Sequence, residues 1–484
     1  MLQLTKKYIQ LGLVALLPLA SCDSYLDVND DPNRAKAVSS DALLSPIIVA
    51  TAEGHYSLAI YTSMFAQQLA AYPSGFQQAD QHIDVRANTA FNTLYLNSLN
   101  NADVLVKQAA AEGSSHYVGI GKVLQALNLG LLSDTWGAVP FSQAFQGPLE
   151  LTPAYDSQEQ IYTTIQRLLD EALVELQKPT STVRPGGDDL IYGGKISSWI
   201  KAANSLKARY AIHLVEKDGV AAANNALTYL ANGISSNLED MQVVYNDKNL
   251  NPWNRNIAIG TTTGNFITAP SSTLINLMNG ITYPGLVDPR LPFLADKGTS
   301  TANYAGLRNG LGTGGNTNIT ANTWYAKPNS PLLMVTFSEM KFIEAEARFI
   351  ANGGTRTSVG STPEAYAAYL AGINAHMDKL GVANKSEYLN NPQVAVGAEN
   401  LTLSLIMKEK LIALYLNPEA WVDVRRYDYA SAIYPGMALP ANHNPALNGQ
   451  FIRRVLYPES EGARNAEEVA KVTKGLAEKM FWDL

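Results

Sequence analysis

The sequence has almost no cysteine, little charge and no basic run. Cys22 is the one cysteine in the 484 residues, which excludes an internal disulfide framework and a cysteine-rich metal site. Charged residues make up 16% of the chain, its formal net charge is -7, and no block of lysines and arginines occurs. The sequence therefore lacks the basic face that is typical of nucleic-acid-binding proteins. Hydrophobic residues make up 46% of it, as expected for a globular chain with a large core.

Motifs typical of catalysis are also absent. The sequence contains neither GxSxG nor HExxH, and the spacing of its six histidines suits no metal site. YGGKISSW at 192–199 partly matches a phosphate loop, but Asp189 replaces the first glycine and Ile196 replaces the Ser or Thr. We therefore predict no catalytic residue, no metal ligand and no cofactor. A glycoside hydrolase stays an alternative, because its two carboxylates can come from distant loops.

The first residues have the pattern of a secretion signal. Two lysines precede the apolar run 8–21, which is shorter than the ~20 residues that span a membrane. Cys22 follows Leu-Ala-Ser, an ending that resembles the lipobox of bacterial lipoproteins. In that class the thiol of the cysteine is acylated, the peptide is cut before it, and the new amine is acylated too. We predict a signal peptide over 1–21 and a lipid anchor at Cys22 in a leading segment 22–40; the alternative is a plain secretory signal with an incidental cysteine.

Helical periodicity dominates most of the remaining chain. Ser157 and Gln160 form a capping box before one apolar-periodic segment, and Thr362 precedes a proline at the first helical position of another. Joints between the segments are short, so we predict a mainly α fold of stacked, tetratricopeptide-like helix hairpins, although no strict repeat occurs. The expected helices fall in two helical parts, 41–239 and 336–484, at 41–71, 89–112, 115–133, 157–177, 195–216, 219–232, 336–351, 362–382, 401–416 and 418–431.

The region 240–335 between these parts has a different composition. GTTTGNFITAPSS and GTSTANYAGLRNGLGTGGNTNITANTWYAKPNS are rich in Gly, Thr and Asn and nearly free of charge. This composition does not sustain long helices and predicts loops with short strands. Phe266, Trp324 and Tyr325 give the loops apolar side chains to pack, so we expect ordered loops rather than a disordered linker. Binding residues commonly lie on such loops when a rigid frame holds them.

Short stretches spread along the chain form an ordered series. They are the lipobox ending at Cys22, YLDVNDDPN, DTWGAVPFSQA at 134–144, VDPRLPF at 287–293, MVTFSEMKFIEAEA at 334–347, LNPEAWVDVRR at 416–426, and RRVLYP at 453–458. Together they resemble the SusD/RagB family of outer-membrane nutrient-binding lipoproteins of the Bacteroidota. The stretches follow the family's order, so the resemblance covers essentially the whole chain.

The resemblance implies a fold and a function. Members of this family have an α-rich fold of tetratricopeptide-like helix pairs that support an irregular ligand-binding face, and they are not enzymes. They lie on the cell surface as lids over a SusC-like TonB-dependent transporter, to which they pass oligosaccharides or peptides. We therefore expect a lipid-anchored protein of the outer membrane that faces the cell exterior.

LNPEAWVDVRR places paired charges on one helix. Glu419 and Asp423 lie four residues apart, with Arg425 and Arg426 just beyond them. Such carboxylates could serve acid–base chemistry, but the spacing favours a structural role. We predict an ion-pair network that joins two helices, with Trp421 in the core.

Three loops combine aromatic side chains with amides or charges, the mixture that binds sugars and peptides. Sugar C–H faces lie on aromatic rings, and sugar hydroxyls need hydrogen-bonding partners such as Asn, Asp, Gln or Arg. The loops near 72–85 and 246–330 are the predicted binding face. Trp253 and Trp324 have an alternative role, which is to fill a small core of the loop region. The candidate ligand-binding residues are Tyr72, Phe76, Gln78, Asp80, Trp253, Arg255, Trp324 and Tyr325.

A protein scaffold is the main alternative function. Helical-repeat proteins present concave surfaces that hold other proteins. A scaffold for another envelope protein would show no saturable binding of a small molecule. A hydrolase would instead release products from an oligosaccharide.

Overall fold

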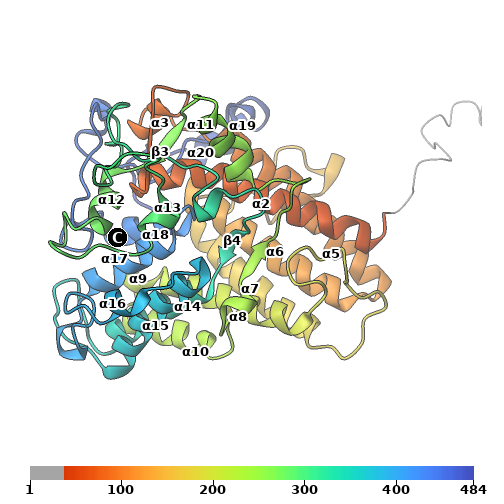
Figure 1. Ribbon diagram of the computed structural model, residues 1–484. Coiled ribbons are helices and arrows are strands. Elements are labelled where there is room, and N and C mark those ends of the chain that lie inside the picture. The colour runs from red at the N-terminus through yellow and green to blue at the C-terminus, as the bar shows by residue number, and fades with distance from the viewer. Residues whose placement is uncertain (1–37, 484) are drawn as a thin grey trace, which may run out of the picture. The chain divides into compact units, whose positions relative to one another are not determined.

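Helices that lie side by side form the frame of the protein. The computed structural model describes residues 38–483, and Ser40–Leu484 form one compact unit. The predicted signal peptide and the anchor at Cys22 lie outside the described residues. The predicted helical class is confirmed, since helices make up most of the elements in Figure 1 and the strands are few and short.

The elements fall into a set of long helices and many short ones. The long helices are α2 (Ser40–Phe65), α5 (Asn100–Glu112), α6 (Ser115–Trp136), α7 (Gln158–Leu176), α8 (Ile196–Ile212), α10 (Val220–Leu230), α14 (Phe337–Ala351), α15 (Pro363–Leu380), α17 (Leu403–Ala413) and α18 (Glu419–Arg426). The short helices are α3 (Gln77–Asp80), α4 (Asn88–Asn92), α9 (Val215–Asp218), α11 (Ile259–Thr262), α12 (Ser272–Met278), α13 (Leu291–Leu294), α16 (Lys385–Leu389), α19 (Glu459–Arg464) and α20 (Ala466–Val472). The π-helical stretches are η2 (Thr93–Leu99) and η5 (Asn254–Ala258), and the 3-10 turns are η3 (Gly147–Leu149), η4 (Asn237–Glu239), η6 (Trp324–Ala326), η7 (Ala398–Asn400) and η8 (Pro445–Leu447). The strands are β1 (Leu69–Ala71), β2 (Met241–Val243), β3 (Thr268–Pro270) and β4 (Leu332–Val335).

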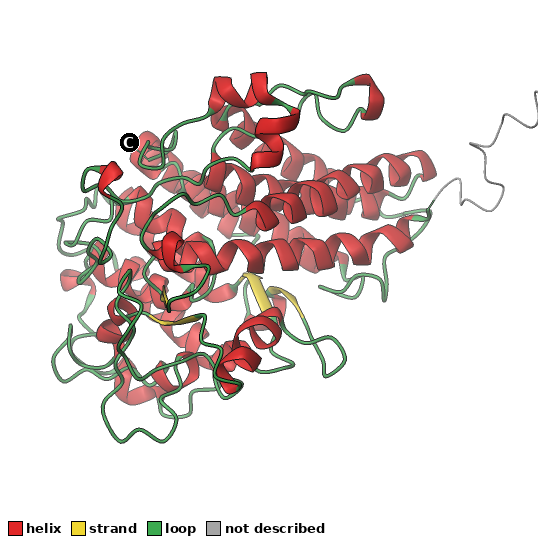
Figure 2. Cartoon of the chain, turned by 90° about the horizontal axis from the view of Figure 1, so that it is seen from above, coloured by secondary structure: helices red, strands yellow, loops and turns green. Residues whose placement is uncertain are grey.

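Consecutive long helices pack against each other. α5 contacts α6, α6 contacts α7 and α7 contacts α8, while α10 contacts both α8 and α14, and α14 packs on α15. Figure 2 shows the long helices running alongside one another. The joint between α5 and α6 is short, because Gly113 adopts the left-handed conformation (φ 72°) that ends α5. The expected helix hairpins are therefore present.

α2 is a core helix. It is the one helix among residues 38–483 whose length and hydropathy would suit a membrane span, and 61% of its most apolar window is buried inside the protein. Gly54 leaves one side of α2 bare, and Leu94 of η2 packs there so closely that a Cβ on residue 54 would lie 2.5 Å from it. A side chain at position 54 would therefore push η2 away from α2.

The predicted helix 41–71 is wrong at its end. α2 stops at Phe65, and Gln67 adopts a left-handed conformation with φ 52°. Leu69–Ala71 then pairs antiparallel with Thr268–Pro270. Helical periodicity could not show this end, because the pairing strand lies far away in the sequence.

Side-chain caps begin helices where the sequence predicts them. Ser157 accepts a hydrogen bond from the N–H of Gln160, whose side chain accepts from the N–H of Ser157, and Thr362 caps α15. Thr336 and Glu339 form a further capping box at the start of α14. Each cap satisfies an N–H that the first helical turn leaves free, a contribution of about 1 kcal/mol.

Buried charged side chains join α14, α17 and α18. Glu346 of α14 pairs with Arg426 at 2.7 Å and with Lys410 at 3.0 Å, and Asp423 contacts the same two cations. All four side chains are buried. The predicted network is therefore present around Asp423 and Arg426, and Glu346 and Lys410 complete it.

Arg425 departs from the predicted ion-pair network. Its Nη1 donates to the backbone carbonyls of Asp134 at 2.6 Å and Arg453 at 2.7 Å. The guanidinium lies 3.6 Å from the ring centroid of Trp421, which is in the core as predicted. Arg425 thus joins three segments through backbone hydrogen bonds and a cation–π contact.

The region 240–335 consists of loops, short helices and strands. Its longest helix, α12, has 7 residues, and β2 pairs antiparallel with β4. β3 pairs with β1, which directly follows α2 in the chain. Figure 1 shows β3, α11 and α12 gathered with α3 at the end of the frame where α2 stops. The strand pairing thus joins these loops to the segment after α2.

Candidate ligand-binding face

The pairing of β1 with β3 brings two predicted loops together. Ala71 lies opposite Thr268, and beyond this pair the N–H of Tyr72 donates to the carbonyl of Ile267 at 3.0 Å. The hydroxyl of Ser74 donates to the same carbonyl at 3.4 Å. The segment after α2 therefore lies against the stretch GTTTGNFIT of the loop-rich region.

Tyr72 and Phe266 form an aromatic pair at the end of this ribbon. Their ring centroids lie 5.5 Å apart, with planes inclined by 51°. Phe266 is 42% exposed and Tyr72 is half-buried. The hydroxyl of Tyr72 donates to Oδ1 of Asn318 at 3.1 Å, and burial raises the pKa of this phenol, so it stays a neutral donor. An accessible aromatic surface thus lies beside a side-chain amide.

Phe76 and Gln78 follow Tyr72 in the same loop. Phe76 is partly buried and meets Tyr61 of α2 edge-on, with ring centroids 5.3 Å apart, and Gln78 is exposed on α3. We call Tyr72, Phe76, Gln78, Phe266 and Asn318 the aromatic loop face. The sequence nominated the first three for binding, gave Phe266 only a packing role and missed Asn318. The only sequence signal for Phe266 is an aromatic residue in a stretch without helical or strand periodicity.

Asp80 lies beneath this face rather than on it. It is buried, and it accepts hydrogen bonds from the N–H groups of Ala71 at 3.0 Å and Gly310 at 2.7 Å, and from the side chain of Asn309 at 2.7 Å. Burial raises the pKa of this carboxyl to about 6, although these hydrogen bonds favour its charged form. The expectation that Asp80 contacts a ligand is therefore corrected: it joins β1 to the loop around Gly310.

Trp253 likewise belongs to the core. It is 3% exposed and packs edge-on against Tyr56 of α2, with ring centroids 4.9 Å apart. Of the two roles considered for Trp253, packing agrees with this burial and ligand binding does not. Arg255 is exposed, but its guanidinium already pairs with Glu53 at 2.8 Å.

Trp324 and Tyr325 are neighbours in η6 and differ in exposure. Trp324 is half-buried, whereas Tyr325 is buried and shares a hydrogen bond of 2.9 Å with Nε2 of His376. Their ring centroids lie 4.9 Å apart. Tyr325 is thus a packing residue, and Trp324 presents part of its ring. In the described part of the chain, no ring contact or hydrogen bond joins Trp324 to the aromatic loop face.

A series of ionisable side chains crosses the core away from this face. The hydroxyl of Tyr162 contacts Oδ1 of Asp134 at 2.5 Å and Nδ1 of His213 at 2.8 Å, and Nε2 of His213 contacts Glu419 at 2.9 Å. Burial opposes ionisation of Glu419, yet the charges of Arg209 and His213 hold its pKa at about 2. The series has the composition of a catalytic relay, but every member is buried, and Tyr162 is the one member that lines a cavity among those described. Among residues 38–483, no group of three or more His, Cys, Asp or Glu is placed to hold a metal ion.

Comparison with known proteins identifies the family. The SusD-like family model described as "Starch-binding associating with outer membrane" matches residues 32–458, most of the chain. The protein belongs to the SusD-like family. The resemblance found in the sequence is thereby confirmed.

Solved SusD-like structures share this fold at low sequence identity. A SusD homolog from Parabacteroides distasonis is 21% identical, with a TM-score of 0.75 over 92% of this chain and 98% of its own. A chitin-binding SusD homolog from Flavobacterium johnsoniae is 21% identical, with a TM-score of 0.73 over 92% of this chain and 98% of its own. A SusD/RagB family protein from Bacteroides thetaiotaomicron is 21% identical, with a TM-score of 0.72 over 92% of this chain and 99% of its own. No curated protein matches the chain.

Proposed function

We propose that this SusD-like protein captures a carbohydrate on the aromatic loop face and passes it to a SusC-like TonB-dependent transporter, for which it acts as a lid. The observation that supports this most directly is the Tyr72–Phe266 pair, an accessible aromatic surface beside the amide of Asn318. The family description names starch and the outer membrane, and the Flavobacterium johnsoniae homolog is a chitin-binding protein. A peptide is the second ligand class, because aromatic surfaces and amides also bind peptides.

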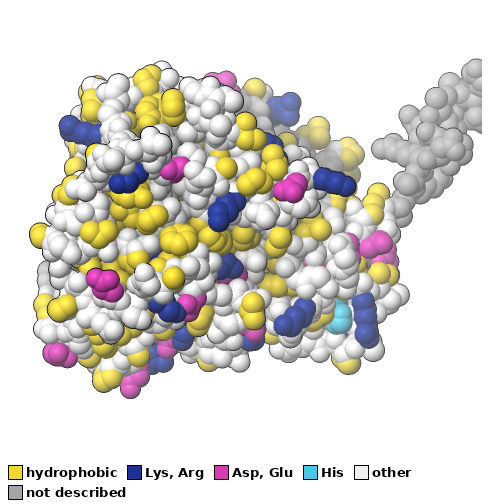
Figure 3. All heavy atoms as spheres, viewed as in Figure 1, with side chains coloured by type: hydrophobic (Ala, Val, Ile, Leu, Met, Phe, Trp, Pro, Cys, Tyr) yellow, Lys and Arg dark blue, Asp and Glu magenta, His cyan; other side chains and the backbone are white. Residues whose placement is uncertain are grey.

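The composition of the face suits an uncharged sugar. Aromatic rings accept the C–H faces of sugars, and the amides of Gln78 and Asn318 both donate and accept hydrogen bonds. Uncharged side chains predominate on the surface shown in Figure 3, and no large patch of a single charge is seen there. The proposed activity is binding and transfer of an intact ligand, without cleavage.

Replacing Tyr72 or Phe266 with alanine is expected to weaken sugar binding about tenfold each, since an aromatic contact of ~1.4 kcal/mol corresponds to that factor. Soluble protein that begins at Asp23 would be titrated calorimetrically with starch and chitin oligosaccharides and with short peptides. Thermal unfolding would be followed in parallel, because a ligand that prefers the folded state raises the midpoint.

Tyr366→Ala is the matched control for these variants. Tyr366 is a half-buried tyrosine on α15 that stacks against Tyr369, away from the aromatic loop face. The variant Tyr366→Ala should bind the sugar with unchanged affinity. Saturable binding that survives in both Tyr72→Ala and Phe266→Ala would contradict the proposed site. Absence of any sugar or peptide binding would favour the scaffold, and release of shorter products would favour a hydrolase.

Replacing Cys22 with alanine is expected to move the protein from the membrane fraction to the soluble fraction of the envelope. Two or more acyl chains give stable anchoring, and the sequence has no other cysteine to acylate. Fractionation of cells that express the wild type or the variant would measure this. An equal share of both proteins in the membrane fraction would show that Cys22 is not the anchor.

A further inference from the structure

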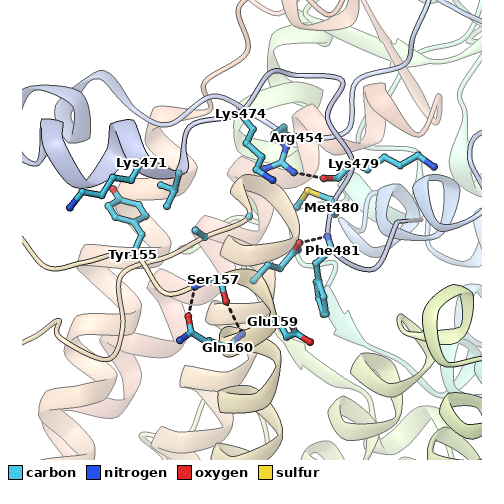
Figure 4. A pocket seen from close by; sticks show the side chains of 14 residues that line it. Tyr155, Ser157, Glu159, Gln160, Arg454, Lys471, Lys474, Lys479, Met480 and Phe481 are labelled. Carbon is cyan, nitrogen blue, oxygen red and sulfur yellow. Dashed lines mark hydrogen bonds between the residues drawn. The ribbon is translucent and has the colours of Figure 1, made fainter.

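A cavity of about 470 Å³ lies where the start of α7 meets the last segment of the described chain. Figure 4 shows the first residues of α7 on one side of it and basic side chains from the C-terminal segment on the other. It shares no residue with the aromatic loop face. Its lining contains four basic side chains, those of Arg454, Lys471, Lys474 and Lys479. In a chain with a formal net charge of -7, this is a concentration of positive charge.

The positive charges of the cavity are poorly neutralised by the protein. Glu159 is the one carboxylate in the lining, and it pairs with Lys217 at 3.2 Å. Lys471 pairs with Glu468 at 2.5 Å. Lys474 and Lys479 are exposed, and within the part of the chain that the structure describes no ion pair reaches either of them.

Arg454 is a buried cation that forms no salt bridge with a carboxylate of residues 38–483, although the charges of Glu478 and Asp483 act on it from nearby. It is 5% exposed, and its Nε and Nη2 donate to the backbone carbonyls of Glu478 at 2.9 Å and Lys479 at 2.5 Å. Its Nη1 lies so close to Gly137, another lining residue, that a Cβ there would be 2.9 Å away. Burial lowers the pKa of this guanidinium, because it disfavours the charged form. A bound anion would offset that cost.

The rest of the lining suits a small organic ligand rather than a bare ion. Phe481 and Met480 supply apolar surface in the lining. Phe481 is held edge-on against Tyr162, with ring centroids 4.9 Å apart, and Nζ of Lys217 lies 4.9 Å from the centroid of its ring, so one face of the ring stays for a ligand. The volume falls within the range of small-molecule sites, roughly 300–1,000 Å³. The start of α7, a helix of 19 residues, adds the positive end of its dipole.

We propose that this cavity binds an anionic sugar of one or two rings, with its carboxylate or sulfate against Arg454 and Lys474, its ring against Phe481, and Lys479 at the edge of the site (Figure 4). The site would give the protein a second ligand class, acidic glycans, beside the uncharged sugar proposed for the aromatic loop face. A concave site of this size favours a sugar unit over a protruding protein segment.

Calorimetric titration of the soluble mature chain with digalacturonate tests the site, with galactobiose as the neutral partner and sodium sulfate as the bare anion. We expect saturable binding of digalacturonate and none of galactobiose. The double variant Lys474→Gln/Lys479→Gln should bind digalacturonate about tenfold or more weakly than the wild type does. Raising the NaCl concentration from about 50 to about 300 mM should also weaken the binding of digalacturonate. Lys195→Gln, which removes one exposed lysine outside the cavity, should leave it unchanged.

Any of three results would contradict the proposal. If the double lysine variant binds digalacturonate with unchanged affinity, the anion binds elsewhere on the protein. If sulfate binds as tightly as digalacturonate, the site binds an anion and does not recognise the sugar ring. Tyr72→Ala separates this site from the aromatic loop face, because digalacturonate should bind that variant as it binds the wild type. Loss of digalacturonate binding in Tyr72→Ala would also contradict a separate site.

Discussion

Replacing Glu346 with alanine is expected to lower the free energy of unfolding by about 3–5 kcal/mol, the loss typical when one partner of a buried ion pair is removed. Glu346 is fully buried and neutralises Arg426 at 2.7 Å and Lys410 at 3.0 Å. Without it, Asp423 would be the one carboxylate among residues 38–483 that pairs with these two buried cations. Urea-induced unfolding, followed by circular dichroism, would measure the difference between variant and wild type.

Glu344→Ala is the matched control on the same helix. Glu344 pairs with Lys341 at 2.8 Å and Arg348 at 2.9 Å, but all three side chains are partly exposed. The expected change is below about 1 kcal/mol, because solvent screens such pairs. Glu346→Gln keeps the side-chain volume and removes the charge. We expect it to lower the free energy of unfolding by nearly as much as Glu346→Ala does. Wild-type stability in Glu346→Gln would show that packing, and not charge, is what Glu346 contributes.

The helical frame and the aromatic loop face are connected through Gln68. Its Nε2 donates to the carbonyls of Leu411 at 2.8 Å and Leu414 at 2.9 Å, and its Oε1 accepts from the N–H of Leu416 at 3.0 Å. These carbonyls lie at the end of α17, the helix that supplies Lys410 to the buried network. Gln68 directly precedes β1, so the frame fixes the strand from which Tyr72 emerges.

The helical frame could be predicted because its signals are local in the sequence. Ser157 and Gln160 cap α7 from within one turn, and the apolar positions of that helix recur every three or four residues, so the expected range 157–177 matches Gln158–Leu176. Arg425 could not be predicted in the same way. Its hydrogen-bond partner, the carbonyl of Asp134, lies 291 residues away in the sequence.

The aromatic loop face is less predictable than the helical frame, because the exposure of each side chain depends on residues that are distant in the sequence. Asp80 looked like a ligand contact beside Gln78, but Asn309 and Gly310, 229 and 230 residues further on, enclose its carboxylate. Asn318 comes beside Tyr72 across 246 residues, on a segment whose backbone pairs with Asp296. The sequence could identify which loops carry aromatic and amide side chains, but only the fold separates the buried ones from the accessible ones.

Acid is expected to destabilise the protein steeply below about pH 4.5. Burial opposes ionisation of Glu346, Glu409 and Glu419, yet neighbouring cations hold the pKa of each at about 2, against an ordinary value of 4.5. As the pH falls, the unfolded chain therefore takes up protons first. The stabilisation is complete above pH 4.5 and is lost as the pH falls toward 2, by several kcal/mol in total. Urea unfolding at pH 7, 5, 4 and 3 would measure it.

Asp80 acts in the opposite direction over a higher range of pH. Its pKa in the folded protein is raised to about 6 from 3.8, so between these values the folded state binds the proton more tightly, and the contribution of Asp80 to stability rises as the pH falls. Between pH 4.5 and 3.8 the gain from Asp80 therefore offsets part of the loss from the three glutamates, and below pH 3.8 only the loss remains. Glu346→Gln provides the control, because it removes one of the three carboxyls whose pKa is lowered. The difference in the free energy of unfolding between this variant and the wild type should narrow as the pH falls from 5 to 3. A gap that stays constant over this range would contradict the titration of Glu346 as a cause of acid unfolding.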